Sequence, residues 1–207
     1  MLEILLLVFS VTIDSFIASI SYGNSKIKIP IISIFLIDII SSSMLALSLI
    51  IGGFLQDYIS INIAKIFSFI ILFLLGLYRL FEGILKSYIN NKTKNSPPLK
   101  FKLFDFNIVL QVYANEIKAD LDKSKILSYK EAIVLSIALS FDSLAVGFGS
   151  SLISINYILV FFISIFIGFI TILLGSYIGN KFSEITNLNL SWLSGFMLVI
   201  LAFLRIF

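Results

Sequence analysis

The chain has 207 residues, of which 59% are hydrophobic and 13% are charged, and its net charge is +3. Soluble domains carry about a quarter charged residues, so this composition excludes an ordinary soluble protein and indicates a membrane protein. The chain holds no cysteine and no histidine, which excludes disulfides, thiolate metal sites and the commonest general base.

Apolar runs of about 20 residues recur along the chain, and such runs are typical of membrane-spanning helices. The first run lacks the basic residues that precede the core of a signal peptide, so we expect a retained helix rather than a cleaved signal. The sequence therefore predicts an all-α polytopic membrane protein with six transmembrane helices, at roughly 4–22, 29–55, 61–85, 131–152, 155–178 and 188–206.

Two of the first three spans carry an aspartate. Asp14 follows Glu3 by eleven residues, which at 1.5 Å per residue places it about 16 Å along the helix, near the middle of a 30 Å hydrocarbon core. Asp38 shares a helical face with Ser41 and Ser42 in the second span. An unpaired charge at such depth costs at least about 2.5 kcal/mol, so we expect both carboxylates to face a cavity or a partner.

The polar segment 86–130 ends in a stretch that has the spacing of an EF-hand loop. Lys125 stands at the sixth position, where such loops normally have glycine. The spacing predicts a site for Ca²⁺ or Mn²⁺, with oxygen-bearing side chains at positions 1, 3, 5, 9 and 12: Asp120, Asp122, Ser124, Ser128 and Glu131.

The end of the same stretch also fits a capping box at the start of the fourth helix, with Ser128 as N-cap and Glu131 at N3. The two interpretations are compatible. The Glu131 carboxylate can cap the helix when no metal is present and bind a cation when one is.

The fourth span repeats the first. Asp142 follows Glu131 at the spacing that separates Asp14 from Glu3, with an offset of 128 residues between the two pairs. Each aspartate lies in the pattern hydroxyl, bulky apolar residue, Asp-Ser, which reads "TIDSF" in the first span and "SFDSL" in the fourth. The third and sixth spans also match, and the second and fifth match more weakly.

The sequence therefore predicts two three-helix repeats, 1–85 and 131–207, joined by the linker 86–130. Because three is odd, the second repeat enters the membrane upside down, an arrangement that recurs in secondary transporters with binding sites near the midplane. Thirteen Lys and Arg residues lie on the linker side and two on the other. We therefore expect the linker in the cytoplasm and both termini outside a bacterial cell membrane.

This architecture predicts a cation site where the repeats meet. Hard oxygen ligands without His or Cys suit Mg²⁺, Ca²⁺ or Mn²⁺ better than zinc or copper. Two facing carboxylates repel each other, so one tends to hold a proton that a divalent cation would displace; sodium coupling stays open. The expected metal ligands are the aspartates and the hydroxyls beside them: Asp14, Asp142, Asp38, Thr12, Ser15, Ser140 and Ser143.

The two aspartate motifs, "TIDSFIAS" and "SFDSLAVGFG", resemble those of the MntP manganese efflux pump family, and "VYANEIKADLDKSKILSYKEAI" resembles the linker of its YtaF branch, which is named for sporulation. The resemblance covers nearly the whole chain. It implies a six-helix pump of two repeats, with Asp14 and Asp142 as transport aspartates and Arg79 and Glu82 in supporting roles.

We therefore expect a secondary transporter that exports a divalent cation, with Mn²⁺ as its first candidate substrate. The alternative is a non-transporting, sporulation-associated membrane protein that organises partners through its linker. The sequence has no nucleotide-binding motif and no evident nucleophile–base arrangement, so we do not expect an enzyme. Expected partners are the lipid bilayer, the divalent cation and a second copy of the chain, without nucleic acid or a permanently bound cofactor.

Overall fold

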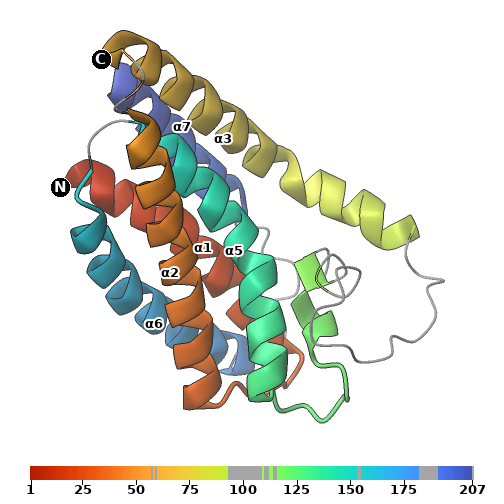
Figure 1. Ribbon diagram of the computed structural model, residues 1–207. Coiled ribbons are helices and arrows are strands. Elements are labelled where there is room, and N and C mark those ends of the chain that lie inside the picture. Colours follow the sequence, from red (N-terminus) through yellow and green to blue (C-terminus); the bar gives the residue numbers. More distant parts are fainter. Residues whose placement is uncertain are drawn as a thin grey trace.

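A computed structural model describes residues 1–56, 58, 60–92, 109, 112–113, 116–152, 155–181 and 191–206. These residues form six α-helices and one short 3-10 helix (Figure 1). The helices are α1 (Leu2–Asn24), α2 (Ile31–Gln56), α3 (Ile61–Lys92), η2 (Glu116–Ala119), α5 (Tyr129–Ser151), α6 (Tyr157–Lys181) and α7 (Ser191–Ile206). The prediction of an all-helical protein is confirmed. The helix ends lie within a few residues of the predicted ones, except that α3 continues past residue 85 to Lys92.

Five of these helices, α1, α2, α3, α5 and α6, are long and apolar enough to cross a membrane. The helix α7 is apolar, but its 16 residues are fewer than the roughly 20 that a typical span needs. The chain is therefore a multi-pass membrane protein, with the sixth predicted span present as a helix of less than spanning length in the described residues.

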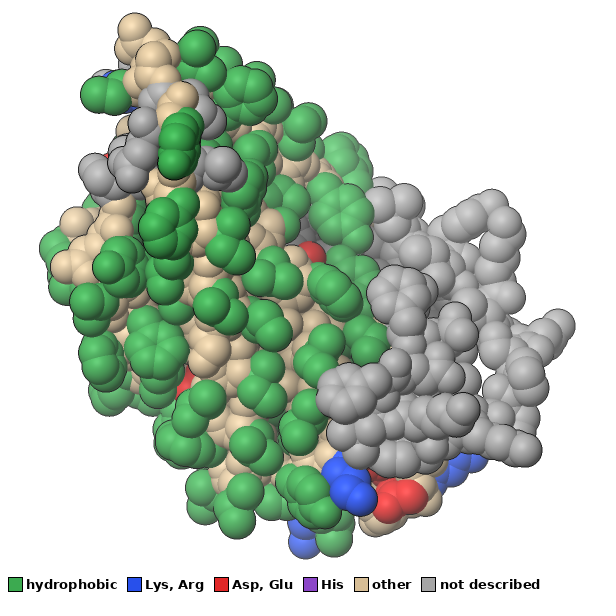
Figure 2. All heavy atoms as spheres, in the orientation of Figure 1, with side chains coloured by type: hydrophobic (Ala, Val, Ile, Leu, Met, Phe, Trp, Pro, Cys, Tyr) green, Lys and Arg blue, Asp and Glu red, His purple; other side chains and the backbone are tan. Residues whose placement is uncertain are grey.

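The distribution of side chains is that of a protein embedded in lipid. Large apolar side chains point outward, among them Phe54, Phe162 and Phe166 with exposed fractions of 67%, 66% and 70%. Figure 2 shows such side chains covering the visible flank of the bundle, with charged ones gathered at its lower end. The buried polar side chains are mostly serines, and small residues of this kind allow close packing between membrane helices.

The turn between α1 and α2 ends α1 in a Schellman motif. Lys26 has a φ of 57°, its N–H donates to the Gly23 carbonyl, and the Ile27 N–H donates to the Tyr22 carbonyl. These two bonds satisfy carbonyls that the end of a helix leaves without partners. Pro30 follows and opens α2, since the Ile34 N–H donates to its carbonyl. The turn thus reverses the chain within a few residues.

The helices α1 and α6 lie side by side and run in the same direction (Figure 1). A Cβ built at Gly23 would lie only 2.6 Å from the backbone nitrogen of Asn180, and one built at Gly179 would lie 3.0 Å from the Cα of Gly23. Further along the pair, Gly175 lies against Ser19. Glycine therefore allows the two backbones to touch.

The helices α2 and α5 form a second parallel pair. The Ser48 hydroxyl donates to the Leu144 carbonyl, and Gly147 lies against the same serine. One turn later, Gly52 lies against Ser151. The remaining long helices, α3 and α7, also pack extensively on each other, with Phe203 edge-on to rings of α3.

The segment before α5 is attached to the turn between α1 and α2. Lys28 and Ile126 form a parallel β-bridge, in which the Lys28 N–H donates to the Lys125 carbonyl and the Leu127 N–H donates to the Lys28 carbonyl, both at 2.9 Å. The Ser33 hydroxyl at the start of α2 also donates to Leu127. This end of the linker therefore lies at the end of the bundle where α1 stops and α2 begins.

The backbone contact between α1 and α6 predicts a clear mutational effect. Gly23→Ala should destabilise the protein by about 1–3 kcal/mol, because the added methyl group would overlap backbone atoms that cannot rotate away. Gly53→Ala is the matched control, since a Cβ at Gly53 meets nothing within 4 Å. Thermal unfolding in detergent should show a lower midpoint for Gly23→Ala alone, and equal midpoints would contradict the contact.

Candidate functional site

The predicted transport aspartates lie at corresponding places in two long helices. Asp14 is the thirteenth of 23 residues in α1, and Asp142 is the fourteenth of 23 in α5. Asp14 is buried, with an exposed fraction of 9%, and Asp142 is partly buried. Each carboxylate thus lies near the middle of its helix.

The hydroxyls predicted as secondary ligands are all buried. The Thr12 hydroxyl donates to the Phe9 carbonyl at 3.3 Å, and the Ser140 hydroxyl donates to the Ile137 carbonyl at 2.9 Å. Both hydroxyls thus use their single proton within their own helix, and their oxygen lone pairs stay available to a cation. Ser15 and Ser143 are 8% and 3% exposed.

Asp38 is the most deeply buried of the three membrane aspartates, with an exposed fraction of 3%. It faces α6, where Gly168 leaves the room for its carboxylate that any larger residue would fill. Its Oδ2 has no hydrogen-bond partner among the described residues, and the same holds for the Ser41 hydroxyl less than one turn further along α2. The sequence-predicted face of Asp38, Ser41 and Ser42 is therefore directed into the protein.

A tyrosine from the linker reaches Asp142. The Tyr113 hydroxyl donates to the Asp142 Oδ1 at 3.3 Å, and the Tyr78 hydroxyl of α3 lies 3.2 Å from that of Tyr113. Sequence patterns did not single out Tyr113, because nothing in the local sequence indicates that the linker folds back onto α5. The side chains of Arg79 and Glu82, for which the family resemblance implies supporting roles, lie outside the described residues.

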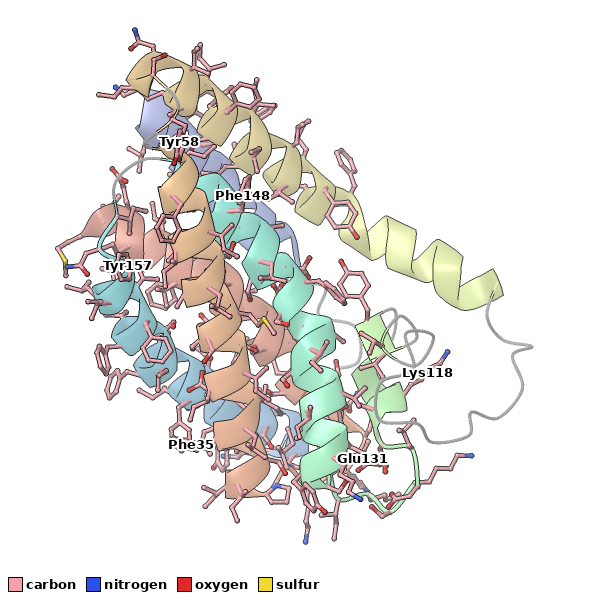
Figure 3. All side chains as sticks on the ribbon, viewed as in Figure 1. Phe35, Tyr58, Lys118, Glu131, Phe148 and Tyr157 are labelled. Carbon is pink, nitrogen blue, oxygen red and sulfur yellow. The ribbon has the colours of Figure 1, made fainter. Side chains whose placement is uncertain are left out.

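The EF-hand-like stretch does bring carboxylates together. Asp120, Asp122 and Glu131 offer ligand atoms that all lie within 4.8 Å of one another. They are the one such group of three acidic side chains among the described residues, so Asp14, Asp38 and Asp142 do not all gather around a single point there. Figure 3 shows Glu131 at the opposite end of the bundle from Tyr58 and Tyr157.

Glu131 also caps α5, as the sequence predicted. Its Oε2 accepts hydrogen bonds from the Ser128 N–H at 2.9 Å and the Ser128 hydroxyl at 2.8 Å, and the Glu131 N–H donates to the Ser128 hydroxyl at 3.4 Å. The capping box is therefore confirmed. The other oxygen, Oε1, accepts from the Leu121 and Asp122 N–H groups, so one buried carboxylate holds the loop to the helix.

The loop turns through two residues in the left-handed region of backbone conformation. Lys125, at the position normally held by glycine, has a φ of 61°, and Lys123 has a φ of 56°. The Lys125 N–H donates to Asp120 at 3.3 Å, and the Ser124 N–H donates to Asp122 at 2.9 Å. The chain therefore makes the sharp turn without glycine, at a cost of about 1 kcal/mol per left-handed residue.

The carboxylates of the loop differ in how readily they ionise. Burial raises the pKa of Asp120; the hydrogen bond from the Lys125 N–H opposes this rise, and the charges of Glu131 and Asp122 add to it. Hydrogen bonds from Ser124 lower the pKa of Asp122. A cation bound among these carboxylates would relieve the repulsion between Asp120 and its acidic neighbours. The cation would bind more weakly as the pH falls, because Asp120 then takes up a proton.

Comparison with known proteins identifies the family. The Mntp family, described as "Putative manganese efflux pump", matches residues 103–206. The "Probable sporulation protein YtaF" of Bacillus subtilis (strain 168) is 32% identical over 152 residues, which cover 71% of this chain and 70% of that protein. The chain belongs to the Mntp family.

The family match, residues 103–206, covers the second half of the chain. It includes the EF-hand-like loop, Asp142 and all of α5, α6 and α7, whereas Asp14 and Asp38 precede it. The Mntp family is described as a pump rather than as an enzyme. No solved structure matches the chain.

Proposed function

We propose that this protein is a secondary transporter that exports a divalent cation, with Mn²⁺ as its first substrate, through a site that includes Asp14 and Asp142. The observation that carries the proposal is a pair of aspartates at corresponding places in two membrane helices of a chain from a manganese efflux pump family. Ionisable residues inside a membrane are costly and typically mark substrate or ion pathways, proton relays, voltage sensors or ligand counter-ions.

The packing of the helices supports an inverted repeat. Gly23 of α1 lies against Gly179 of α6, and Ser151 of α5 lies against Gly52 of α2. Residues 23 and 151 differ by the offset of 128 that relates Asp14 to Asp142, and residues 52 and 179 differ by 127. Exchanging the halves thus converts one helix pair into the other. The helix α2 runs opposite to α1, and α5 runs parallel to α2. The helix α5 therefore runs opposite to α1, its counterpart in the other repeat (Figure 1).

Alternating access follows naturally from this arrangement. Two halves of opposite orientation can rock against each other, so that a site at their interface opens to one side of the membrane and then to the other. Asp14 and Asp142 belong to different halves, and their carboxylates with Thr12, Ser15, Ser140 and Ser143 offer only hard oxygen ligands, which suit Mn²⁺. Asp38 does not gather with both of the other aspartates around one point in the described structure, so it would carry the exchanged proton rather than complete the same set of ligands.

We assign the linker and the turn between α1 and α2 to the cytoplasmic side, and both termini to the outside. Lys26 and Lys28 lie in that turn, which is bonded to the linker at Lys125 and Leu127. The positive charges of the turn and of the described end of the linker, at Lys123 and Lys125, therefore lie at one end of the bundle, which agrees with the positive-inside rule.

A second candidate function is cation sensing by the linker. We propose that the loop 120–131 binds Ca²⁺ or Mn²⁺ through Asp120, Asp122 and Glu131, with Ser124 and Ser128 as further oxygens. The observation that favours it is the convergence of the three carboxylates, among which the buried Oδ1 of Asp120 has no hydrogen-bond partner in the described part of the chain. Because Glu131 also caps α5, a bound cation would act on the helix that carries Asp142.

The transport proposal predicts protection against manganese. Expression in a manganese-sensitive host without its own exporter should restore growth and lower cell manganese, measured by mass spectrometry. Asp14→Asn and Asp142→Asn, at equal abundance, should each return cell manganese to the level of the empty host, because asparagine keeps the size but removes the charge that holds the ion. Glu3→Gln, which changes an acidic residue at the start of α1, should keep the protection.

Two results would contradict this proposal. Full protection by both variants would exclude Asp14 and Asp142 as ligands of the transported ion. Absence of protection by the wild-type protein would favour a protein that organises partners without transport, in line with the sporulation name of the Bacillus subtilis relative.

The linker proposal predicts calcium binding that depends on Asp122. Full-length protein carrying Asp14→Asn and Asp142→Asn, purified in detergent, should bind Ca²⁺ in calorimetry. Adding Asp122→Asn should weaken the affinity about tenfold or more, since the charge of the ligands sets affinity in such loops, while the amide oxygen can still accept from Ser124. Lys123→Gln, at a position that supplies no ligand, is the control. Absence of heat at millimolar Ca²⁺ would refute the site.

A further inference from the structure

Tyr113 connects the linker to the proposed transport site. Its hydroxyl donates to the Asp142 Oδ1 at 3.3 Å and lies 3.2 Å from the Tyr78 hydroxyl. A hydroxyl has one proton, so a Tyr113 that donates to Asp142 accepts from Tyr78. The two phenols then form a short chain of donors that ends on a carboxylate inside the membrane, with each bond polarising the next.

The contact is held by buried packing on the chain just before Tyr113. Val112 is fully buried and Val109 is 7% exposed. Both belong to an apolar cluster that includes Tyr22 of α1, Ile34 of α2 and Ala138 of α5, with Tyr113 packed against it. The same cluster also includes Ile172 of α6, so the phenol is positioned by packing that joins the linker to four membrane helices.

The Tyr113 phenol and a bound cation would compete for the same oxygen atoms of Asp142. A hydrogen bond from a phenol compensates the charge of a carboxylate that has no cation, and bonds to charged groups are stronger than those between neutral ones. A divalent cation bound by Asp142 needs the same oxygen atoms as ligands. A cation that binds the Asp142 Oδ1 must displace the Tyr113 hydroxyl. The displaced hydroxyl can still form a hydrogen bond with Tyr78.

We propose that the Tyr113 hydroxyl is hydrogen-bonded to the Asp142 carboxylate when no cation is bound, and that the transported cation displaces it. The linker would then set the apparent affinity of the transport site for the cation. The inference rests on the proposed function, since it takes Asp142 as a ligand of the transported ion. Tyr113, a linker residue outside the long helices, would then directly affect the affinity for the transported cation.

The test is Mn²⁺ flux into proteoliposomes that contain the full-length protein. Tyr113→Phe keeps the ring and its packing but removes the competing donor, so KM should fall about 3- to 10-fold while the maximal rate changes less than twofold. Tyr78→Phe should shift KM in the same direction by a smaller factor, because it only weakens the donor. Tyr157→Phe, an exposed tyrosine of α6, should leave KM unchanged.

A structural role would give a different pattern. Val112→Ala loosens the same cluster without touching the hydroxyl, so it should not reproduce the fall in KM; if it does, Tyr113 acts only through packing and the inference fails. An unchanged or raised KM in Tyr113→Phe, with normal wild-type flux, also overturns the inference and leaves the proposed function standing. Absence of wild-type flux, with folded protein in the vesicles, refutes the proposed function and the inference together.

Discussion

An ionised carboxylate in the hydrocarbon core of a bilayer costs at least about 2.5 kcal/mol unless other groups compensate its charge. Three aspartates of this protein stand under that constraint, each in different surroundings. Asp142 accepts a hydrogen bond from a linker tyrosine, Asp14 is buried near the hydroxyls of its own helix, and Asp38 fits against a glycine of α6. A divalent cation shared by such carboxylates is the most direct form of compensation, and the proposed transport follows from it.

The second constraint is that helices in lipid associate through close packing rather than through hydrophobic attraction. Here glycine and serine bring α1 against α6 and α2 against α5, and Gly23 and Gly179 let two backbones touch. Each half of the chain thus contributes one helix to each parallel pair. In the proposed transport cycle, motion of one half relative to the other would shift both pairs together.

The helices and the loop were predictable because their signals are local. Hydropathy indicates each span, and the capping box and the ring of carboxylates fall within twelve residues, from Asp120 to Glu131. Lys125 departs from the glycine that the loop pattern has at this position, and it takes a left-handed conformation all the same. The contact between Tyr113 and Asp142 was not predictable, because 29 residues separate its partners and no periodicity reports on long-range packing. The continuation of α3 to Lys92 was missed because hydropathy reports on the membrane, not on helix length.

In the proposed transport site, Asp14 and Asp142 hold one divalent cation together. Equilibrium dialysis of ⁵⁴Mn²⁺ against purified protein tests it most directly, in a background of Asp120→Asn and Asp122→Asn that disables the linker loop. Asp14→Asn, Asp142→Asn and the double variant should all lose the bound ion to the same extent, because both carboxylates serve one site. If each single variant only halves the binding and only the double variant abolishes it, the two aspartates form independent sites and do not share one cation.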